Sequence, residues 1–237
     1  MKALIVAFHT LTIIRIKEVE ADFSDSLVYF PVVGLFFGSV FLMIYFLWKR
    51  FLPDWNLGLS FVILLSEIIL TGGLHIDGLS DFADSLGASK REEKLRIMED
   101  PSIGVFGSCA VFLDLILRII AISRILSDDI TPIVAVPAIS RCMMVDMCVS
   151  LPYAKKEGTG KAFVIGAQEK HRLYAFLICI TICIFFGTKG IMLFFISVFA
   201  NQLLKLFFKK EFKGITGDLL GSTNEIITML LLFFLAI

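Results

Sequence analysis

The sequence predicts an all-α, polytopic integral membrane protein, and three observations carry this prediction. Of the 237 residues, 57% are hydrophobic and 19% are charged, and the mean hydropathy is +0.88, which is too apolar for a soluble domain of this length. Apolar runs of membrane-spanning length recur along the chain. Lys and Arg gather in alternate connections between these runs, as they do on the cytoplasmic side of membrane proteins.

About seven transmembrane helices are expected, and a total of six or eight would require one apolar run to be reassigned. The candidate spans are residues 30–48, 57–74, 103–126, 130–151, 173–186, 191–208 and 219–237. Trp48, Lys49 and Arg50 end the first of these runs in the way that interfacial residues do. The chain shows no internal repeat and no low-complexity linker, so residues 1–237 are expected to form a single transmembrane domain.

An earlier apolar run, residues 3–14, leads to a different prediction. It is too short to cross the roughly 30 Å of hydrocarbon in a bilayer. No small-residue cleavage site follows it, and Arg15 and Lys17 close it at once, so it does not have the pattern of a signal peptide. We expect an interfacial or re-entrant segment here.

The placement of the basic residues predicts the orientation. With the N-terminus in the cytoplasm, sixteen Lys and Arg residues fall on that side, and three, Lys49, Arg50 and Lys189, fall on the other. This is a strong positive-inside bias. The loop that carries an aspartate cluster, the loop 152–172 and the loop 209–221 then share the cytoplasmic face.

Composition also argues against two classes of site. The 22 bases and 22 acids cancel, so nothing indicates a nucleic-acid partner. The five cysteines lie in apolar stretches without CxxC spacing, which is typical of small buried side chains and not of a disulfide framework or a zinc site.

The aspartate cluster is the strongest local signal. Asp77, Asp81 and Asp84 stand at i, i+4 and i+7, so on a helix their carboxylates lie within about 40° of one face. Like charges this close need water or a cation between them. Oxygen ligands of this kind suit Mg²⁺, with Mn²⁺ as a substitute, and Mg²⁺ is usually shared with the phosphates of a substrate.

A solvated acidic helix face is the alternative interpretation of these aspartates. Two features favour a metal and phosphate site over it. The cluster directly follows an apolar span, where idle carboxylates are costly. In addition, Gly72, Gly73 and Gly78 leave room for a phosphate to approach the backbone closely.

The segment Gly72–Asp84, followed by Arg91, 97–100 and 103–107, resembles the signature of the cobalamin synthases, the membrane-bound adenosylcobinamide-GDP ribazoletransferases. Further stretches resemble the same family, and the resemblance covers nearly the whole chain. These stretches are Ser140-Arg141, 151–154, 157–160, 216–225, 30–34 and, more weakly, Phe8 with Leu11-Thr12.

The resemblance implies a Mg²⁺-dependent transfer. Such enzymes join adenosylcobinamide-GDP to α-ribazole or its 5′-phosphate and release GMP, which completes the nucleotide loop of the corrinoid. It also implies a multi-pass protein of the prokaryotic inner membrane, with the lipid bilayer around it and its active-site loops in the cytoplasm. The small-molecule substrates are the expected partners, and assembly as a homo-oligomer or with other late enzymes of cobalamin synthesis is left open.

Carried onto this sequence, the resemblance names three groups of site residues. The expected metal ligands are acids: Asp77, Asp81, Asp84, Asp100 and Glu225. The expected catalytic residues are His75, Asp81 and Asp84, with either His75 or Asp84 as acceptor of the ribazole hydroxyl proton. The expected substrate-binding residues are Gly73, Gly78, Arg91, Gly104, Gly107, Arg141, Asp218 and Asn224.

Several charged residues also have a purely structural interpretation. Arg141 lies inside an apolar run, which favours a functional role, but it could instead pair with Asp146 or Asp114. Asp114 and Arg118 stand at i and i+4, which predicts a pair on one helix face. Lys94 and Arg96 are expected on a solvated helix face.

Two acids also fit helix-start patterns. Asp100 precedes Pro101, which indicates a turn or a helix start. Glu225 stands third after Ser222, so Ser222 or Thr223 could cap a helix there. If Glu225 instead lies in a span, it must face the protein interior or a cavity.

Three other functions fit parts of the pattern less well. A CDP-alcohol phosphotransferase needs an Ala-Arg pair after its Asp-Gly, and here Gly78 is followed by Leu79-Ser80-Asp81. A polyprenyl transferase needs two DxxxD loops, and only Asp77 to Asp81 has that form. A secondary transporter is expected to show repeated halves, which this chain lacks.

Overall fold

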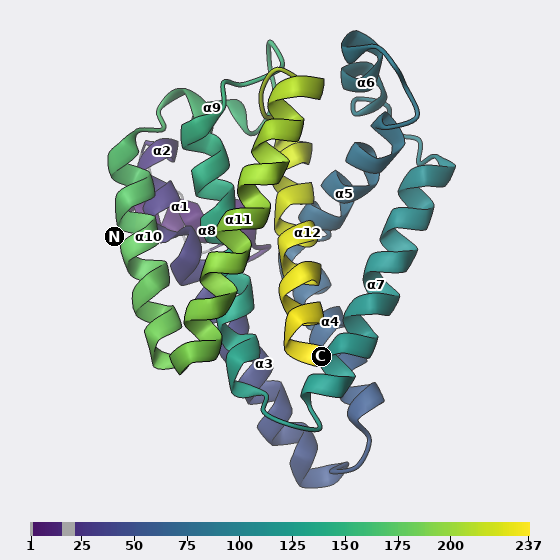
Figure 1. Ribbon diagram of the computed structural model, residues 1–237, viewed down its shortest axis with the longest axis vertical. Coiled ribbons are helices and arrows are strands. Elements are labelled where there is room, and N and C mark those ends of the chain that lie inside the picture. The colour runs from purple at the N-terminus through teal and green to yellow at the C-terminus, as the bar shows by residue number, and fades with distance from the viewer. Residues whose placement is uncertain (1, 16–21) are drawn as a thin grey trace.

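A computed structural model describes residues 2–15 and 22–237, and its architecture is a helical bundle (Figure 1). Within these two ranges no strand forms, and the sole β-type pairing is a parallel bridge between Tyr153 and Ile215. The predicted all-α class is therefore confirmed.

Seven longer helices run roughly along the long axis of the bundle. They are α3 (Phe30–Phe51), α4 (Asn56–Thr71), α7 (Val105–Ile125), α8 (Val136–Ser150), α10 (Glu169–Phe185), α11 (Gly187–Glu211) and α12 (Gly217–Ala236). Shorter elements sit between them or at one end. These are α1 (Lys2–Leu11), α2 (Phe23–Ser26), η1 (Leu27–Tyr29), α5 (Leu74–Ser85), α6 (Arg91–Ile97), η2 (Thr131–Ala135) and α9 (Lys161–Ile165).

The expected count of seven spans is not confirmed. Among the described residues, five helical stretches are long and apolar enough to cross a membrane: Phe23–Phe51, Val105–Ile125, Thr131–Ser150, Gly187–Glu211 and Gly217–Ala236. A sixth is possible only if α4 and α5 together count as one bent span. The 17-residue α10 lies where the short span 173–186 was expected, and it falls below the roughly 20 residues that a span usually needs.

The N-terminal apolar run 3–14 is helical only as far as Leu11. The helix α1 has ten residues, too few to span a bilayer. Ile13 N–H, just after α1, donates to the carbonyl of Leu70 at 2.8 Å, which ties this segment to the end of α4.

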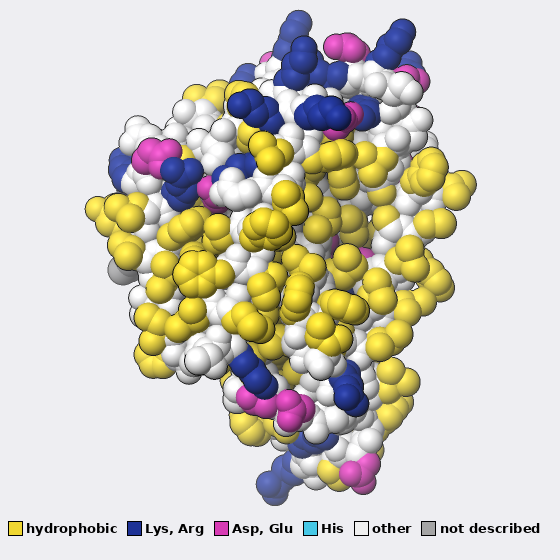
Figure 2. Space-filling model, in the orientation of Figure 1, with side chains coloured by type: hydrophobic (Ala, Val, Ile, Leu, Met, Phe, Trp, Pro, Cys, Tyr) yellow, Lys and Arg dark blue, Asp and Glu magenta, His cyan; other side chains and the backbone are white. Residues whose placement is uncertain are grey.

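The surface has the banding of a membrane protein (Figure 2). Hydrophobic side chains cover the middle of the face shown, Lys and Arg crowd the end that carries α6, and a smaller mixed group of charges lies at the other end. Large apolar side chains of α7 and α11, such as Phe112, Phe195 and Phe199, are mostly exposed, as expected for contact with lipid. Which end faces the cytoplasm stays a prediction.

The helix α8 forms the centre of the bundle, because every residue from Val136 to Cys148 is buried. The helix α3 approaches it closely through two glycines. A Cβ atom on Gly34 would lie 2.2 Å from the carbonyl oxygen of Pro137, and one on Gly38 would lie 2.2 Å from that of Val134. Only glycine allows the two backbones to pack at this separation.

A sharp break separates α4 from α5. Gly72 and Gly73 have φ angles of 63° and 75°, a left-handed conformation that glycine adopts without a Cβ penalty. The axes of α4 and α5 consequently meet at 89°. The expected span 57–74 therefore ends at Thr71, and the aspartates stand on a helix of their own.

The close contact of α3 with the centre of the bundle gives the first prediction. Gly38→Ala should destabilise the protein by about 1–3 kcal/mol, because the new methyl group has to displace the Val134 backbone. Ser39→Ala is the control, since Ser39 is exposed on the same helix. The thermal unfolding midpoint in detergent is the measurement. Equal midpoints for the two variants would contradict the close packing.

Candidate active site

The helix α5 carries the predicted cluster of carboxylates. Asp77, Asp81 and Asp84 lie on this one helix, as the sequence predicted. Asp77 is exposed, whereas Asp81 and Asp84 are partly buried. The charge of Asp81 is repelled by those of Asp77 and Asp84, so the three carboxylates are crowded in the way that their spacing indicates.

A fourth carboxylate joins them from the other end of the chain. Asp218 stands in the first turn of α12, and its charge also acts on Asp81. Gly78 permits this approach, because a Cβ there would lie 2.7 Å from the carbonyl oxygen of Asp218. We call Asp77, Asp81 and Asp218 the acidic cluster. Lys155 Nζ lies 3.1 Å from Asp218 Oδ2 and supplies one positive charge.

Asp84 has a structural task beside this cluster. Its Oδ2 accepts the N–H of Gly104 at 2.7 Å, and its Oδ1 accepts the N–H of Gly107 at 2.8 Å. The carboxylate thus caps the N-terminus of α7, where a negative charge is stabilised. A Cβ on Gly104 or Gly107 would lie 2.4 or 2.3 Å from this carboxylate, so in this structure both glycines make room for Asp84.

Two cavities meet at Asp77. The outer one, of about 860 Å³, lies between α1, α5 and α7 and is lined by residues such as Thr12, Ser80 and Phe112. The inner one, of about 280 Å³, extends to α8, α9 and α12. His75, at the start of α5, lines the inner cavity and is buried.

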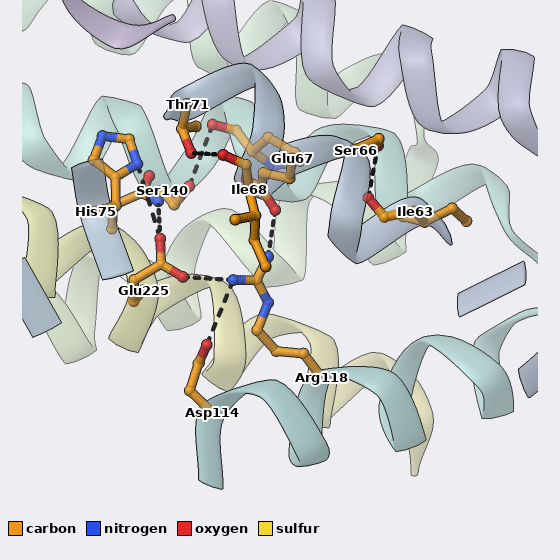
Figure 3. Close-up of polar contacts among 12 residues, drawn as sticks. Ile63, Ser66, Glu67, Ile68, Thr71, His75, Asp114, Arg118, Ser140 and Glu225 are labelled. Carbon is orange, nitrogen blue, oxygen red and sulfur yellow. Dashed lines mark hydrogen bonds and ion pairs between the residues drawn. The ribbon is translucent and has the colours of Figure 1, made fainter. Parts of the chain in front are cut away.

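A buried ion-pair network lies next to His75 (Figure 3). His75 Nδ1 lies 3.8 Å from Glu225 Oε1. The guanidinium of Arg118 in turn pairs with Glu225, with Glu67 and, at 3.6 Å, with Asp114. These side chains come from α4, α5, α7 and α12 and converge inside the bundle. The predicted Asp114–Arg118 pair and the inward orientation of Glu225 are confirmed.

Arg141 belongs to the same network, and both partners suggested for it from the sequence were wrong. It is fully buried, its Nη2 lies 3.4 Å from Glu67 Oε1, and its guanidinium stacks 4.3 Å from the ring centroid of Phe37. Asp146 instead binds Lys205, with Nζ 2.7 Å from Oδ2. The sequence could not reveal this, because Glu67 is far from Arg141 along the chain.

A family described as cobalamin-5-phosphate synthase matches residues 3–236. The chain belongs to this family. Proteins named adenosylcobinamide-GDP ribazoletransferase are similar to it along nearly their whole length. The one from Chlorobium phaeobacteroides (strain BS1) is 35% identical over 234 residues, covering 95% of this chain and 93% of the relative.

Two further relatives have the same name and a similar level of identity. The protein of the same name from Chlorobium chlorochromatii (strain CaD3) is 35% identical, with 94% of this chain and 91% of the relative covered. That from Clostridium botulinum (strain Okra / Type B1) is 34% identical, with 91% and 89% covered. No solved structure matches. The predicted resemblance is confirmed, and the chain is a membrane enzyme of cobalamin nucleotide-loop assembly.

Several residues that the cobalamin-synthase resemblance assigned to the site lie away from the acidic cluster. Glu225 and Asn224 are buried in the network, where Asn224 Nδ2 donates to Glu225 Oε1 at 2.9 Å. Asp100 is exposed in a turn, and its Oδ1 accepts the N–H of Ser102 at 2.9 Å. This hydrogen bond holds the pKa of Asp100 below its usual value. Gly73 forms the break between α4 and α5.

Two basic residues of α6, Arg91 and Lys94, bind neighbouring segments of the chain. Arg91 Nε donates to the Phe212 carbonyl at 2.8 Å, and its Nη2 donates to that of Ala154 at 2.9 Å, so it joins three loops. Lys94 is buried, pairs with Glu211 and lies 5.6 Å from the Phe212 ring centroid. The prediction of a solvated Lys94 was therefore wrong.

The start of α12 also differs from the sequence prediction. Thr216 is the N-cap, and its hydroxyl accepts the N–H of Leu219 at 3.2 Å. Ser222 and Thr223 lie within the helix and do not cap it. This earlier start places Asp218 in the first turn, where it reaches the acidic cluster.

Sequence reasoning missed two residues near the acidic cluster, Lys155 and Tyr153. Lys155 also lies 3.8 Å from Glu99 Oε1. Burial, and then the charge of Asp218, raise the pKa of Tyr153. Both residues stand in the motif stretch around 151–160, but nothing in their spacing shows that this loop folds against α12.

The acidic cluster offers the donor set that Mg²⁺ prefers. Its ligands would be carboxylate oxygens that are partly open to water. Across the described ranges, no group of three or more His, Cys, Asp or Glu side chains is already close enough to hold an ion. Mg²⁺ usually takes only one or two carboxylates and completes its shell with water and substrate phosphate, so the cluster fits such an ion.

The network gives the second prediction. Arg118→Met should lower the free energy of unfolding by about 3–5 kcal/mol, because it leaves Glu225 and Asp114 without a guanidinium partner and leaves Glu67 with Arg141 alone. Arg124→Met is the matched control, since Arg124 is exposed on the same helix. Denaturant unfolding in detergent measures the difference. A loss no greater than that of the control would show that the network is not needed for stability.

Proposed function

We propose that this chain joins adenosylcobinamide-GDP to α-ribazole or its 5′-phosphate and releases GMP. The observation that carries the proposal is the acidic cluster at the meeting point of two cavities. Family membership supplies the substrates, because the relatives are named for this transfer. The cavities supply room for two substrates beside one set of carboxylates.

The acidic cluster is suited to the diphosphate end of the corrinoid substrate. Asp77, Asp81 and Asp218 would hold a Mg²⁺ ion, with Mn²⁺ as a substitute, which supplies neutralisation of the charge that develops on the GMP leaving group. Asp84 holds the start of α7 in place through its two backbone hydrogen bonds. Lys155, beside Asp218, is placed to contact a phosphate oxygen.

In the proposed reaction, a ribazole hydroxyl oxygen attacks the phosphorus that carries adenosylcobinamide. A new P–O bond forms as the bridging P–O bond to GMP breaks. The hydroxyl proton passes to His75, whose two ring nitrogens have no hydrogen-bond partner among the described residues. Asp84 is less suited to this role, because both of its oxygens already accept backbone N–H groups.

The surroundings of His75 keep its ring neutral before the reaction, because burial and the guanidinium groups of Arg141 and Arg118 hold the pKa of His75 well below its usual value. Three carboxylates, Glu67, Asp114 and Glu225, face two guanidinium groups, those of Arg118 and Arg141. When all five are ionised, one negative charge is left unbalanced. An imidazolium 3.8 Å from Glu225 would balance this charge.

We also propose that the enzyme lies in a prokaryotic inner membrane with α6 and the acidic cluster on the cytoplasmic side. The crowding of Lys and Arg at that end of the molecule supports this orientation (Figure 2).

The third prediction tests the acidic cluster. Asp77→Asn should reduce GMP release by about 10²-fold or more, because it removes a charged oxygen ligand while keeping the side-chain shape. The assay uses purified protein in nanodiscs with adenosylcobinamide-GDP and α-ribazole, with Mg²⁺ and after chelation by EDTA.

Asp128→Asn is the matched control. Asp128 is exposed at the opposite end of the bundle and pairs with Lys189 at 3.7 Å. Both variants should keep the wild-type unfolding midpoint. A rate for Asp77→Asn close to that of the control, or a wild-type rate unaffected by EDTA, would refute the proposed metal site.

A further inference from the structure

The inner cavity has two chemically different sides. Its deep wall is apolar and buried, and is formed by Leu11, Phe30, Met144, Cys148 and Phe163. Its other side is polar and more exposed, and is formed by Asp77, Thr159 and Asp218. A ligand that fills this cavity therefore has an apolar body and a polar end that faces the acidic cluster.

The apolar wall suits a flat aromatic ring. Phe163, on α9, lies with its ring centroid 5.9 Å from that of Phe30 at an interplanar angle of 59°, and 5.3 Å from that of Phe23 at 82°. Tilted and edge-to-face rings are the arrangement in which aromatic groups attract one another. The sulfur atoms of Met144 and Cys148 add polarisable contacts that also favour aromatic partners.

The side chain of His75 is buried without a hydrogen-bond partner among the described residues, which indicates that the cavity binds a polar ligand. It is 2% exposed, yet neither ring nitrogen has a hydrogen-bond partner in the described part of the chain. Buried polar groups are almost always paired, and an unpaired one costs about 1–3 kcal/mol. Because His75 lines the cavity, a hydroxyl group of the ligand can supply the missing bond.

The two cavities differ in volume and in the charged residues that line them. The inner one, of about 280 Å³, is at the lower limit of small-molecule pockets, which run from about 300 to 1,000 Å³. No Lys or Arg occurs among the described residues that line it, so it is a poor site for a diphosphate. A corrinoid macrocycle is far larger than the inner cavity. The outer cavity, of about 860 Å³, is open to the surface and also reaches Asp77, so it is the better site for the corrinoid substrate.

We propose that the inner cavity is the acceptor site and binds the aromatic base of an N-riboside, with the ribose at the polar side between His75 and Asp77. The inference rests on the proposed function for the identity of the riboside. Phe163, Met144 and Cys148 then determine which bases fit. The two substrates reach Asp77 from opposite sides, and a 5′-phosphate on the riboside points out of the cavity.

Two substitutions in the apolar wall test this site in the full-length protein in nanodiscs. Phe163→Leu removes the aromatic edge, and Cys148→Leu narrows the cavity. Phe163→Leu should raise the KM for α-ribazole by about two- to tenfold, the range expected for loss of an aromatic pair. Cys148→Leu should also raise this KM, because the larger side chain takes space from the base. The KM for adenosylcobinamide-GDP should stay within about twofold of wild type, as expected when only the acceptor's binding contacts are removed.

Phe176→Leu is the matched control, because Phe176 pairs with Phe194 at 5.5 Å between α10 and α11, away from the cavity. Titration of α-ribazole and of its 5′-phosphate without the corrinoid gives their dissociation constants. Both dissociation constants should increase by the same factor in Phe163→Leu if the two acceptors share the base site.

The outcomes separate this inference from the proposed function. If the protein turns over but both wall variants keep the wild-type KM and dissociation constant for α-ribazole, the acceptor site is wrong and the function stands. If α-ribazole binds and the variants weaken it, but no GMP is released by wild type, the site stands and the reaction is wrong. Equal increases in both KM values would also overturn the inference.

Discussion

The pairing of buried charges around Arg118 is the interaction on which the rest of the structure depends. A guanidinium inside an apolar bundle is tolerated only when carboxylates surround it. Arg118 on α7 meets Glu67 on α4 and Glu225 on α12, and Arg141 on α8 shares Glu67. Four helices are thereby fixed relative to one another. Apolar packing alone specifies register poorly in lipid, so these pairs give the bundle its alignment.

The position of the acidic cluster depends on this alignment of the helices. Glu225 reaches His75 at the start of α5, and the 89° break at Gly72 and Gly73 turns that helix across the bundle. Its aspartates therefore meet Asp218 on α12, where Gly78 allows close contact. One pair of helices thus connects the ionic core of the membrane region to the carboxylates at its surface.

Local features were readable from the sequence, whereas long-range pairings were not. Composition and apolar runs predicted an all-α membrane protein, and the spacing of Asp77, Asp81 and Asp84 predicted one helix. The i, i+4 rule found the Asp114–Arg118 pair, because both partners lie on one helix. The Arg141–Glu67 pair and the burial of Lys94 against α11 depend on tertiary packing, which periodicity does not encode. The break at Gly72 and Gly73 was likewise hidden, since the apolar run continues through it.

We propose that Asp77, Asp81 and Asp218 hold the metal against the substrate diphosphate. Electron paramagnetic resonance of Mn²⁺ bound to the full-length protein with adenosylcobinamide-GDP can test this metal site through the hyperfine coupling of Mn²⁺ to ³¹P. We expect a ³¹P coupling in the wild-type protein that is lost in both Asp77→Asn and Asp218→Asn. A ³¹P-coupled Mn²⁺ signal that persists in both variants would show that other residues hold the metal.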